Sequence, residues 1–481
     1  MTRGFDKIVP FSLAVAGLLA SLVFDQLHPG YFSDVKYLGA LIGLQIILAS
    51  LWHYDVVFFP LVLAFFLWSG MDIPLSTVGK TARWFVLAVA AFAGFVMWMR
   101  EHRRTFGLFH LVALFCVLAA VTSAAVSADP STSVLKALSL FLLFLYAATG
   151  ARLAIWGREV QFIEGLLLAC EIAAYFSAAA YLLIGWQVFG NPNSLGAIMG
   201  VAVTPLLFWA VLVARTPAQR YRRLMALVLS GVLLYLSLAR AGLLAAAIAV
   251  AALCICLRRQ RLLVGGVFVI VVFVSTATLV YPAHFDLFVE AETSRVLYKG
   301  KREQGLMASR LTPWQETVAV IKTRPWFGSG FGTSYLGQFA KPRGVDSDPS
   351  LGGLSTKANR EHGNSYLALL EYVGLLGILP FGVLVFLLAR MVFQVFVWMR
   401  RTANPYHCAI PFAMVVLAGL VHAIFEDWLT AVGYYLCVFF WACAFWLRDM
   451  MPAPITAPAR EAPAPTHTRV VSSYGTIVPN R

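Results

Sequence analysis

Long apolar runs of roughly 16–20 residues recur from the N-terminus to about Leu447. A helix needs about 20 such residues to cross a bilayer core about 30 Å thick. Of the 481 residues, 60% are hydrophobic and only 12% are charged, against about 25% charged in soluble domains. We therefore predict an all-α, polytopic integral membrane protein with about 12–14 transmembrane helices.

The expected spans follow the apolar runs directly. We place them at residues 8–24, 35–52, 54–69, 83–99, 107–125, 133–151, 163–187, 195–214, 223–238, 240–257, 262–281, 365–390, 408–424 and 429–447. The first run follows Arg3 and Lys7 and has the form of a signal peptide. Because many spans follow it, we interpret it as an uncleaved first helix.

Arginine is concentrated in alternate connections between these spans, and this sets the orientation. With the N-terminus inside, the cytoplasmic connections hold Arg100, Arg103, Arg104, Arg152, Arg158, Arg215, Arg220, Arg222, Arg223, Arg258, Arg259, Arg261, Arg400 and Arg401. The turns at 25–34, 126–132 and 188–194 contain no Lys or Arg. The net charge of +14 therefore reflects membrane topology and predicts no nucleic-acid partner.

This orientation places three polar features on the outer face: the turn at Asn191, the turn at Arg240 and the long loop 282–364. In a Gram-negative cell that face is the periplasm, so the expected location is the bacterial inner membrane. The chain then divides into transmembrane residues 1–281, the large outer loop 282–364, transmembrane residues 365–448 and a disordered cytoplasmic tail 449–481. The loop is where a membrane protein of this kind can place water-exposed chemistry.

The loop carries a helix start. Thr312 is a good N-cap, Pro313 suits the first helical position and Gln315 completes a capping box. Trp314, Val318 and Ile321 then form an apolar stripe that would lie against the membrane or the bundle. The helix should stop at Pro325. It is followed by a glycine turn, residues 328–332, whose backbone can approach a ligand closely.

Two outer-face arginines point to an anionic ligand. Arg310 stands just before the expected helix, whose N-terminus favours anions. Arg240 ends a span, where an arginine is often only a snorkelling anchor, yet its outer position runs against the positive-inside bias. Arginine forks match phosphate oxygens, so the pair suggests a pyrophosphate headgroup.

His362 adjoins the start of a span and is one of few histidines on the outer face. A neutral imidazole with a pKa near 6.5 can take a proton from a hydroxyl as a general base. The alternative is a surface histidine without a catalytic role, and the residue pattern leaves both open.

Several segments together resemble the O-antigen ligase and Wzy-type polymerase superfamily. They are Phe189–Gly196, Ser237–Arg240, Ser309–Trp314, Pro325–Gly332, His362–Leu367 and Gly374–Gly377. They occur in the family's order, and the resemblance covers roughly residues 165–445. In the family the histidine is directly followed by asparagine, whereas Gly363 separates His362 from Asn364 here.

The resemblance implies a GT-C-like glycosyltransferase that moves a glycan from undecaprenyl pyrophosphate to an acceptor hydroxyl, with inversion and without a metal or cofactor. The acceptor would be lipid A-core for a ligase or a lipid-linked glycan for a polymerase, and the sequence leaves these two open. Arg240 and Arg310 would stabilise the leaving pyrophosphate, with His362 acting on the acceptor hydroxyl.

Five further residues are candidates for substrate binding: Asn191, Asn193, Asn364, Trp314 and Arg324. Asn191 and Asn193 could bond sugar hydroxyls or phosphates, although turn formation and N-capping explain them equally well.

Competing interpretations rest on acidic residues. Asp346-Ser347-Asp348 has the spacing of a metal-dependent glycosyltransferase, in a segment that is expected to be mobile. Glu426 and Asp427 form an outer-face pair that could position a basic group or only mark a solvated turn.

Two other functions stay open. A transporter or flippase of lipid-linked sugars would place charge near the membrane midplane, and Glu164 and Glu171 lie within a span. A protein O-oligosaccharyltransferase would use the same chemistry with a protein acceptor.

Overall fold

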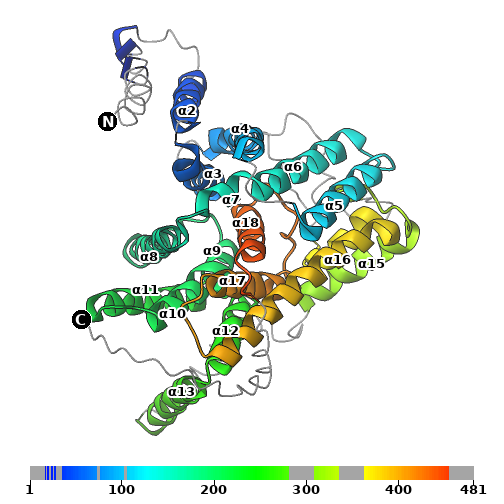
Figure 1. Cartoon of the computed structure of the whole chain (residues 1–481). Coiled ribbons are helices and arrows are strands. Elements are labelled where there is room, and N and C mark those ends of the chain that lie inside the picture. The colour runs from blue at the N-terminus through cyan, green and yellow to red at the C-terminus, as the bar shows by residue number, and fades with distance from the viewer. Residues whose placement is uncertain are drawn as a thin grey trace, which may run out of the picture.

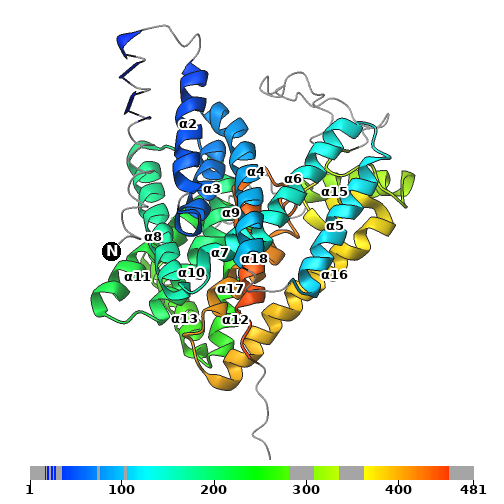
Figure 2. The same cartoon turned by 45° about the horizontal axis from the view of Figure 1, so that its top comes forward.

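The computed structural model of the chain describes residues 35–51, 53–72, 76–101, 106–280, 308–334 and 362–453, with some positions between 17 and 28. Figures 1 and 2 show these residues as a bundle of helices, and no strand occurs among them. The predicted all-α, polytopic class is confirmed. Most of the expected first span and most of the expected tail lie outside the described residues.

From residue 35 onward, each predicted span coincides with helix. The elements are α2 (Val35–Leu51), α3 (Tyr54–Gly70), α4 (Ser76–Glu101), α5 (Leu108–Ala124), α6 (Pro130–Ala148), α7 (Gly150–Ile155), α8 (Glu159–Ile184), α9 (Pro192–Ile198), the π-helical η1 (Met199–Val203), α10 (Thr204–Leu212), α11 (Pro217–Leu236), α12 (Arg240–Cys256), α13 (Gln260–Val280), α15 (Ala308–Thr323), α16 (Ser365–Thr402), α17 (Ala409–His422) and α18 (Tyr435–Asp449).

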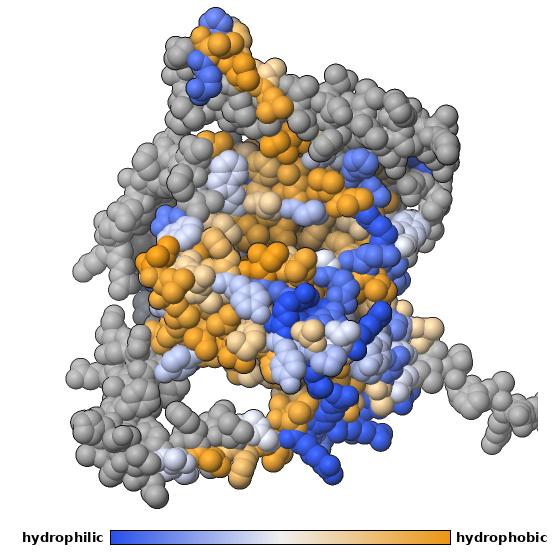
Figure 3. Space-filling model, turned by 90° about the vertical axis from the view of Figure 1, so that its left-hand side faces the viewer, coloured by the Kyte–Doolittle hydropathy of each residue, from blue (hydrophilic) through white to orange (hydrophobic). Residues whose placement is uncertain are grey.

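Five helical stretches of the described chain are long and apolar enough to cross a membrane. They are Val78–Arg100, Pro130–Ile155, Glu159–Ile184, Pro192–Leu212 and Ser365–Thr402. Shorter apolar helices, such as α5, α12 and α17, stand beside them. Figure 3 shows hydrophobic side chains over much of one face, with hydrophilic ones gathered in one region. The expected total of about 12–14 spans stays a prediction.

The centre of the bundle is α18, which Figure 1 shows surrounded by the other helices. Every residue from Tyr435 to Leu447 is buried, and Trp441 and Trp446 are almost completely enclosed. A helix that is apolar on all sides belongs in such a position. The span expected at 429–447 begins only at Tyr435, because the backbone N–H groups of Trp428 and Leu429 donate to the Ser365 hydroxyl instead of starting a helix.

The helix α16 is longer than expected, ends at Thr402 and is broken at Gly374. Gly374 has φ 66°, a conformation that favours glycine. The break frees the carbonyl groups of Glu371 and Tyr372, which accept from the N–H groups of Ser329 (2.8 Å) and Gly330 (3.2 Å). In return, Leu375 donates to Pro325 (2.7 Å), so the glycine turn and the broken helix satisfy each other's backbone.

The expected start of α15 is wrong. The helix begins at Ala308, and Pro313 lies inside it, so Thr312 is not an N-cap. Arg310 therefore belongs to the first turn of the helix and does not precede it. Val318 of the expected stripe is exposed and Thr317 is completely buried, and contact of the stripe with the membrane stays a prediction. Figure 2 shows α15 packed along α16.

Small residues let η1 and α12 pack closely. A Cβ atom built on Gly200 would lie 2.4 Å from the carbonyl oxygen of Gly242, so only glycine fits there. Gly196 of α9 approaches the turn at Ser237 and Ala239 in the same way. Small residues at helix interfaces are typical of membrane proteins. This contact fixes the Asn191 turn beside the Arg240 turn.

Two acidic residues within the spans, Glu164 and Glu171, have ion-pair partners. Glu171 of α8 forms an ion pair with Arg222 of α11 at 2.5 Å and lies 3.5 Å from Arg223. Glu164 also pairs with Arg223. These contacts join α8 to α11, which removes the sequence argument for a transporter that rested on Glu164 and Glu171.

Candidate functional site

His362 lies between two carboxylates just before α16. Its Nδ1 atom is 2.7 Å from Oδ2 of Asp427, and its Nε2 atom is 3.3 Å from Oε2 of Glu371. The Tyr372 hydroxyl is 3.4 Å from Nδ1, and the two rings meet edge to face. His362 and Glu371 are fully buried, whereas the Asp427 side chain is 15% exposed. The partly accessible member of this cluster is therefore Asp427.

The environment of His362 favours the charged imidazolium. Burial alone would lower its pKa, but the hydrogen bonds and charges of Asp427 and Glu371 outweigh burial and raise the pKa to about 9. The ring therefore already carries its second proton at neutral pH. A general base must first lose that proton, so the role expected from the ordinary pKa of about 6.5 stays a prediction that this pKa disfavours.

Arg310 and Trp314 extend from one face of α15 toward the residues beside His362. The indole nitrogen of Trp314 donates to the Gly363 carbonyl at 3.1 Å, and the Arg310 guanidinium pairs with Glu426. A Cβ atom on Gly363 would lie 2.9 Å from Nη1 of Arg310. The glycine that separates His362 from Asn364 therefore makes room for the arginine, and its φ of 63° suits glycine.

Arg240 completes the cluster at the first position of α12. Leu238 has φ 53°, and the Ser237 hydroxyl accepts from the Ala239 N–H at 3.2 Å, which holds the sharp turn that precedes α12. The half-buried Arg240 guanidinium interacts electrostatically with that of Arg310. Two like charges that interact with each other are typical of a site that receives an anion.

The glycine turn contacts the residues that surround His362. The backbone of the turn lies close against α16, because a Cβ atom on Gly328 would lie 2.5 Å from the Glu371 carbonyl oxygen. Lys136 of α6 donates to the Gly332 carbonyl at 2.5 Å and interacts electrostatically with Asp427. The Ser334 hydroxyl donates to the Glu371 carboxylate. Together these contacts fix the carboxylates that face His362.

Two of the three predicted asparagines have capping roles in this structure. Asn191 caps α9 by accepting from the Ser194 N–H at 2.7 Å, and Asn364 caps α16 by accepting from Tyr366 and Leu367. Asn191 and Asn193 are exposed. Their substrate-binding roles stay predictions.

One predicted residue lies away from the cluster, and one predicted motif lies outside the described residues. Arg324 donates to the Val126 carbonyl at 3.1 Å. It lies about 20 Å from Arg310 at 1.5 Å of helix per residue, so the structure does not bring it to His362. Asp346 and Asp348 lie outside the described residues.

Sequence reasoning underrated the carboxylates of this site. Glu371 lies inside the apolar span expected at 365–390, and an ionisable residue there is a signal in itself. The open question about Glu426 and Asp427 is answered by their contacts, because each positions a basic group. No local pattern points to Lys136, Tyr372 or Ser334.

Fold and site together define a polytopic helical membrane protein with a basic, carboxylate-supported cluster at one end of its bundle. Residues 225–382 match the O-antigen ligase family, and this segment contains Arg240, Arg310 and His362. The match supports membership of the O-antigen ligase and Wzy-type polymerase superfamily, and with it a glycosyltransferase-type membrane enzyme that acts on lipid-linked glycans. No curated protein matches the chain.

Proposed function

We propose that this protein transfers a glycan from undecaprenyl pyrophosphate to an acceptor hydroxyl at the outer, periplasmic face of the bacterial inner membrane. The observation that carries the proposal is the convergence of Arg240 and Arg310 beside the His362–Asp427 pair. Two arginine forks can bind the oxygens of a diphosphate leaving group, and an acceptor hydroxyl needs a group to receive its proton. A GT-C-like fold fits the helical bundle and belongs to this proposal.

The reaction is a single displacement with inversion. The acceptor oxygen forms a bond to the anomeric carbon while the bond from that carbon to the pyrophosphate oxygen breaks, and its electron pair leaves with the pyrophosphate. Arg240 and Arg310 stabilise the negative charge that develops on the leaving oxygen. Glu426 holds the Arg310 guanidinium in place for this purpose.

The acceptor proton goes to Asp427 in this mechanism. Of the two carboxylates that contact His362, Asp427 is the one that is partly exposed, and the buried imidazolium orients it through a 2.7 Å hydrogen bond. Glu371 holds the other side of the ring. His362 is thus essential as a positioning residue, although it does not take the proton itself.

Single substitutions in the purified, liposome-reconstituted protein test these roles. Arg310→Lys and Arg240→Lys each remove one fork and should lower transfer roughly 10²–10³-fold, as expected for the loss of one leaving-group donor. Asp427→Asn should lower it at least as much. Arg324→Lys, directly after the end of α15, is the control and should retain nearly full activity. Full activity of Arg310→Lys would contradict the proposal.

The acceptor class is tested in a strain that lacks this protein. Long lipid-linked chains together with bare lipid A-core would identify a ligase, and single repeats without long polymer would identify a polymerase. Unchanged glycans in every pool would refute the function.

A further inference from the structure

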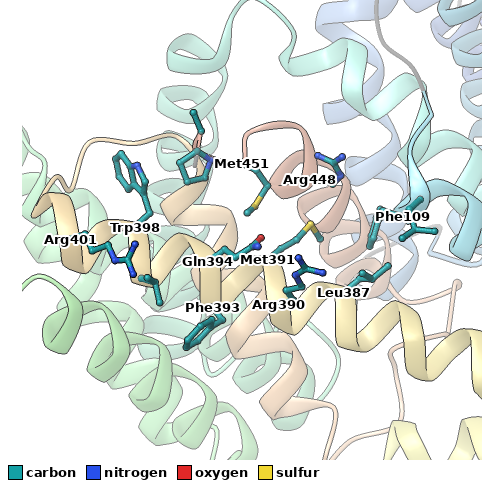
Figure 4. Close-up of a pocket in the computed structure, with 14 residues that line it drawn as sticks. Phe109, Leu387, Arg390, Met391, Phe393, Gln394, Trp398, Arg401, Arg448 and Met451 are labelled. Atoms are coloured by element: carbon teal, nitrogen blue, oxygen red, sulfur yellow. The ribbon is translucent and has the colours of Figure 1, made fainter. Parts of the chain in front are cut away.

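A groove of about 680 Å³ lies far from the His362 cluster, between the start of α5, the second half of α16 and the end of α18. Its walls include the apolar side chains of Leu387, Phe393 and Met451. Three arginines line it, namely Arg390, Arg401 and Arg448, together with Gln394. Figure 4 shows Arg390 and Arg401 extending from α16, with Arg448 coming from α18.

The three arginines lack acidic partners. Within the described part of the chain, none of them forms an ion pair or a hydrogen bond, whereas nearby Arg152 is bound by Asp449 at 2.6 Å. Arg390, Gln394 and Arg401 recur at a spacing that places them on one face of α16. The groove therefore concentrates three positive charges that no carboxylate balances, and such a groove favours an anionic ligand.

The surroundings of the groove are those of a lipid headgroup region. The residues that flank the arginines are apolar and strongly exposed, with Leu108 at 64% and Phe393 at 67%. Trp398 lines the same groove, and tryptophan is typical of the boundary between membrane and water. A free anion would leave this apolar wall uncovered, whereas a lipid would cover it with its acyl chains.

We propose that this groove binds an acidic phospholipid, with the headgroup phosphate on Arg390, Arg401 and Arg448 and the acyl chains along Leu387, Phe393 and Leu108. Arginine forks fit phosphate oxygens, and basic pockets between membrane helices select anionic headgroups. The site is separate from the proposed transfer site, because α16 runs from the His362 cluster to the groove over 25 residues between Ser365 and Arg390.

Binding of phosphatidylglycerol to the purified full-length protein in detergent, measured by native mass spectrometry, tests the proposal. The groove variant carries Arg390→Gln, Arg401→Gln and Arg448→Gln. The control variant carries Arg258→Gln, Arg259→Gln and Arg261→Gln, which removes the same charge at exposed positions outside the groove. Each groove arginine near an anionic headgroup contributes about fivefold, so the groove variant should bind on the order of a hundredfold more weakly.

The control variant should bind phosphatidylglycerol like the native chain, and phosphatidylcholine should bind weakly to all three proteins. An equal loss of phosphatidylglycerol binding in both variants would show nonspecific electrostatic attraction and would overturn the proposal. Unchanged binding by the groove variant would also overturn it. Displacement of the lipid by inorganic phosphate alone would identify a free-anion site instead. Quenching of Trp398 by brominated phosphatidylglycerol, measured against Trp398→Phe, provides a test that leaves the arginines intact.

Discussion

At the scale of single residues, the site depends on how two neighbouring carboxylates change the charge state of His362. His362 is fully buried, which alone would favour its neutral form, yet Asp427 and Glu371 hold it in the charged form. Of these two carboxylates, Asp427 is the one that is partly exposed. The chemical role of the pair therefore follows from exposure and charge, and not from the ordinary basicity of imidazole.

The raised pKa makes stability depend on pH. The pKa of His362 is about 9 in the folded state and about 6.5 when unfolded. Protonation therefore stabilises the fold fully below about pH 6.5, and this contribution disappears as the pH rises to about 9. It is on the order of 3 kcal/mol. Thermal unfolding in detergent should lose this pH dependence in His362→Gln.

His407→Gln is the matched control, because burial lowers the pKa of His407 and it titrates below this window. That variant should keep the native pH dependence. An identical dependence in His362→Gln would mean that the imidazolium is not held by the two carboxylates.

At the scale of elements, the broken helix α16 and the glycine turn form one unit. The carbonyl groups of Glu371 and Tyr372 accept from the turn, and the turn's carbonyl groups at Pro325 and Trp326 accept from Leu375 and Leu376. Each element thereby satisfies backbone groups that the other leaves open. The carboxylate of Glu371 reaches His362 only because it stands at this break.

Gly374→Ala should disrupt that unit. A Cβ atom there would lie 2.4 Å from the Trp326 carbonyl oxygen, and φ is 66°. We expect a loss of roughly 1–3 kcal/mol in the free energy of unfolding and a strong loss of glycan transfer. Thermal unfolding and transfer assays measure these effects.

Gly382→Ala is the control on the same helix, where an added Cβ meets nothing within 4 Å. It should be neutral or stabilise the helix by up to about 1 kcal/mol. A Gly374→Ala variant as stable as Gly382→Ala would show that the break is not needed.

At the scale of the whole molecule, a buried ion pair joins the central helix to the outer helices. Arg152 of α7 holds Asp449 of α18 through bonds of 2.6 and 2.8 Å, and its guanidinium lies 4.1 Å from the centre of the Trp98 ring. The two charged side chains are 2% and 8% exposed. The position of α18 therefore depends on both partners being present.

Asp449→Asn should leave Arg152 as an uncompensated buried charge. We expect a destabilisation of about 3–5 kcal/mol, seen as a lower midpoint of thermal unfolding. Asp55→Asn is the control, because its pair with Arg158 is 3.8 Å apart and largely exposed, so its loss should cost less than about 1 kcal/mol. Similar midpoints for both variants would contradict this role.

The orientation across the membrane gives a prediction at the same scale. Phe327 and Tyr406 are exposed near opposite ends of α16. In a chain without its own cysteines, a membrane-impermeant maleimide should label Phe327→Cys in intact spheroplasts. It should label Tyr406→Cys only after permeabilisation. The reverse pattern would invert the topology and remove the outer-face proposal.

The sequence by itself determined the all-α membrane class and the position of nearly every apolar helix from residue 35 onward, because apolar length is a local property of the chain. It also pointed to Arg240, Arg310 and His362, since each stands in a recognisable motif. Local capping signals placed the start of α15 wrongly, because contacts of Arg310 and Trp314 with distant residues stabilise an earlier start. Only the tertiary structure decided the charge state of His362. Asp427 is 65 residues away along the chain, and a pKa depends on whatever charges packing brings near, however distant they are in sequence.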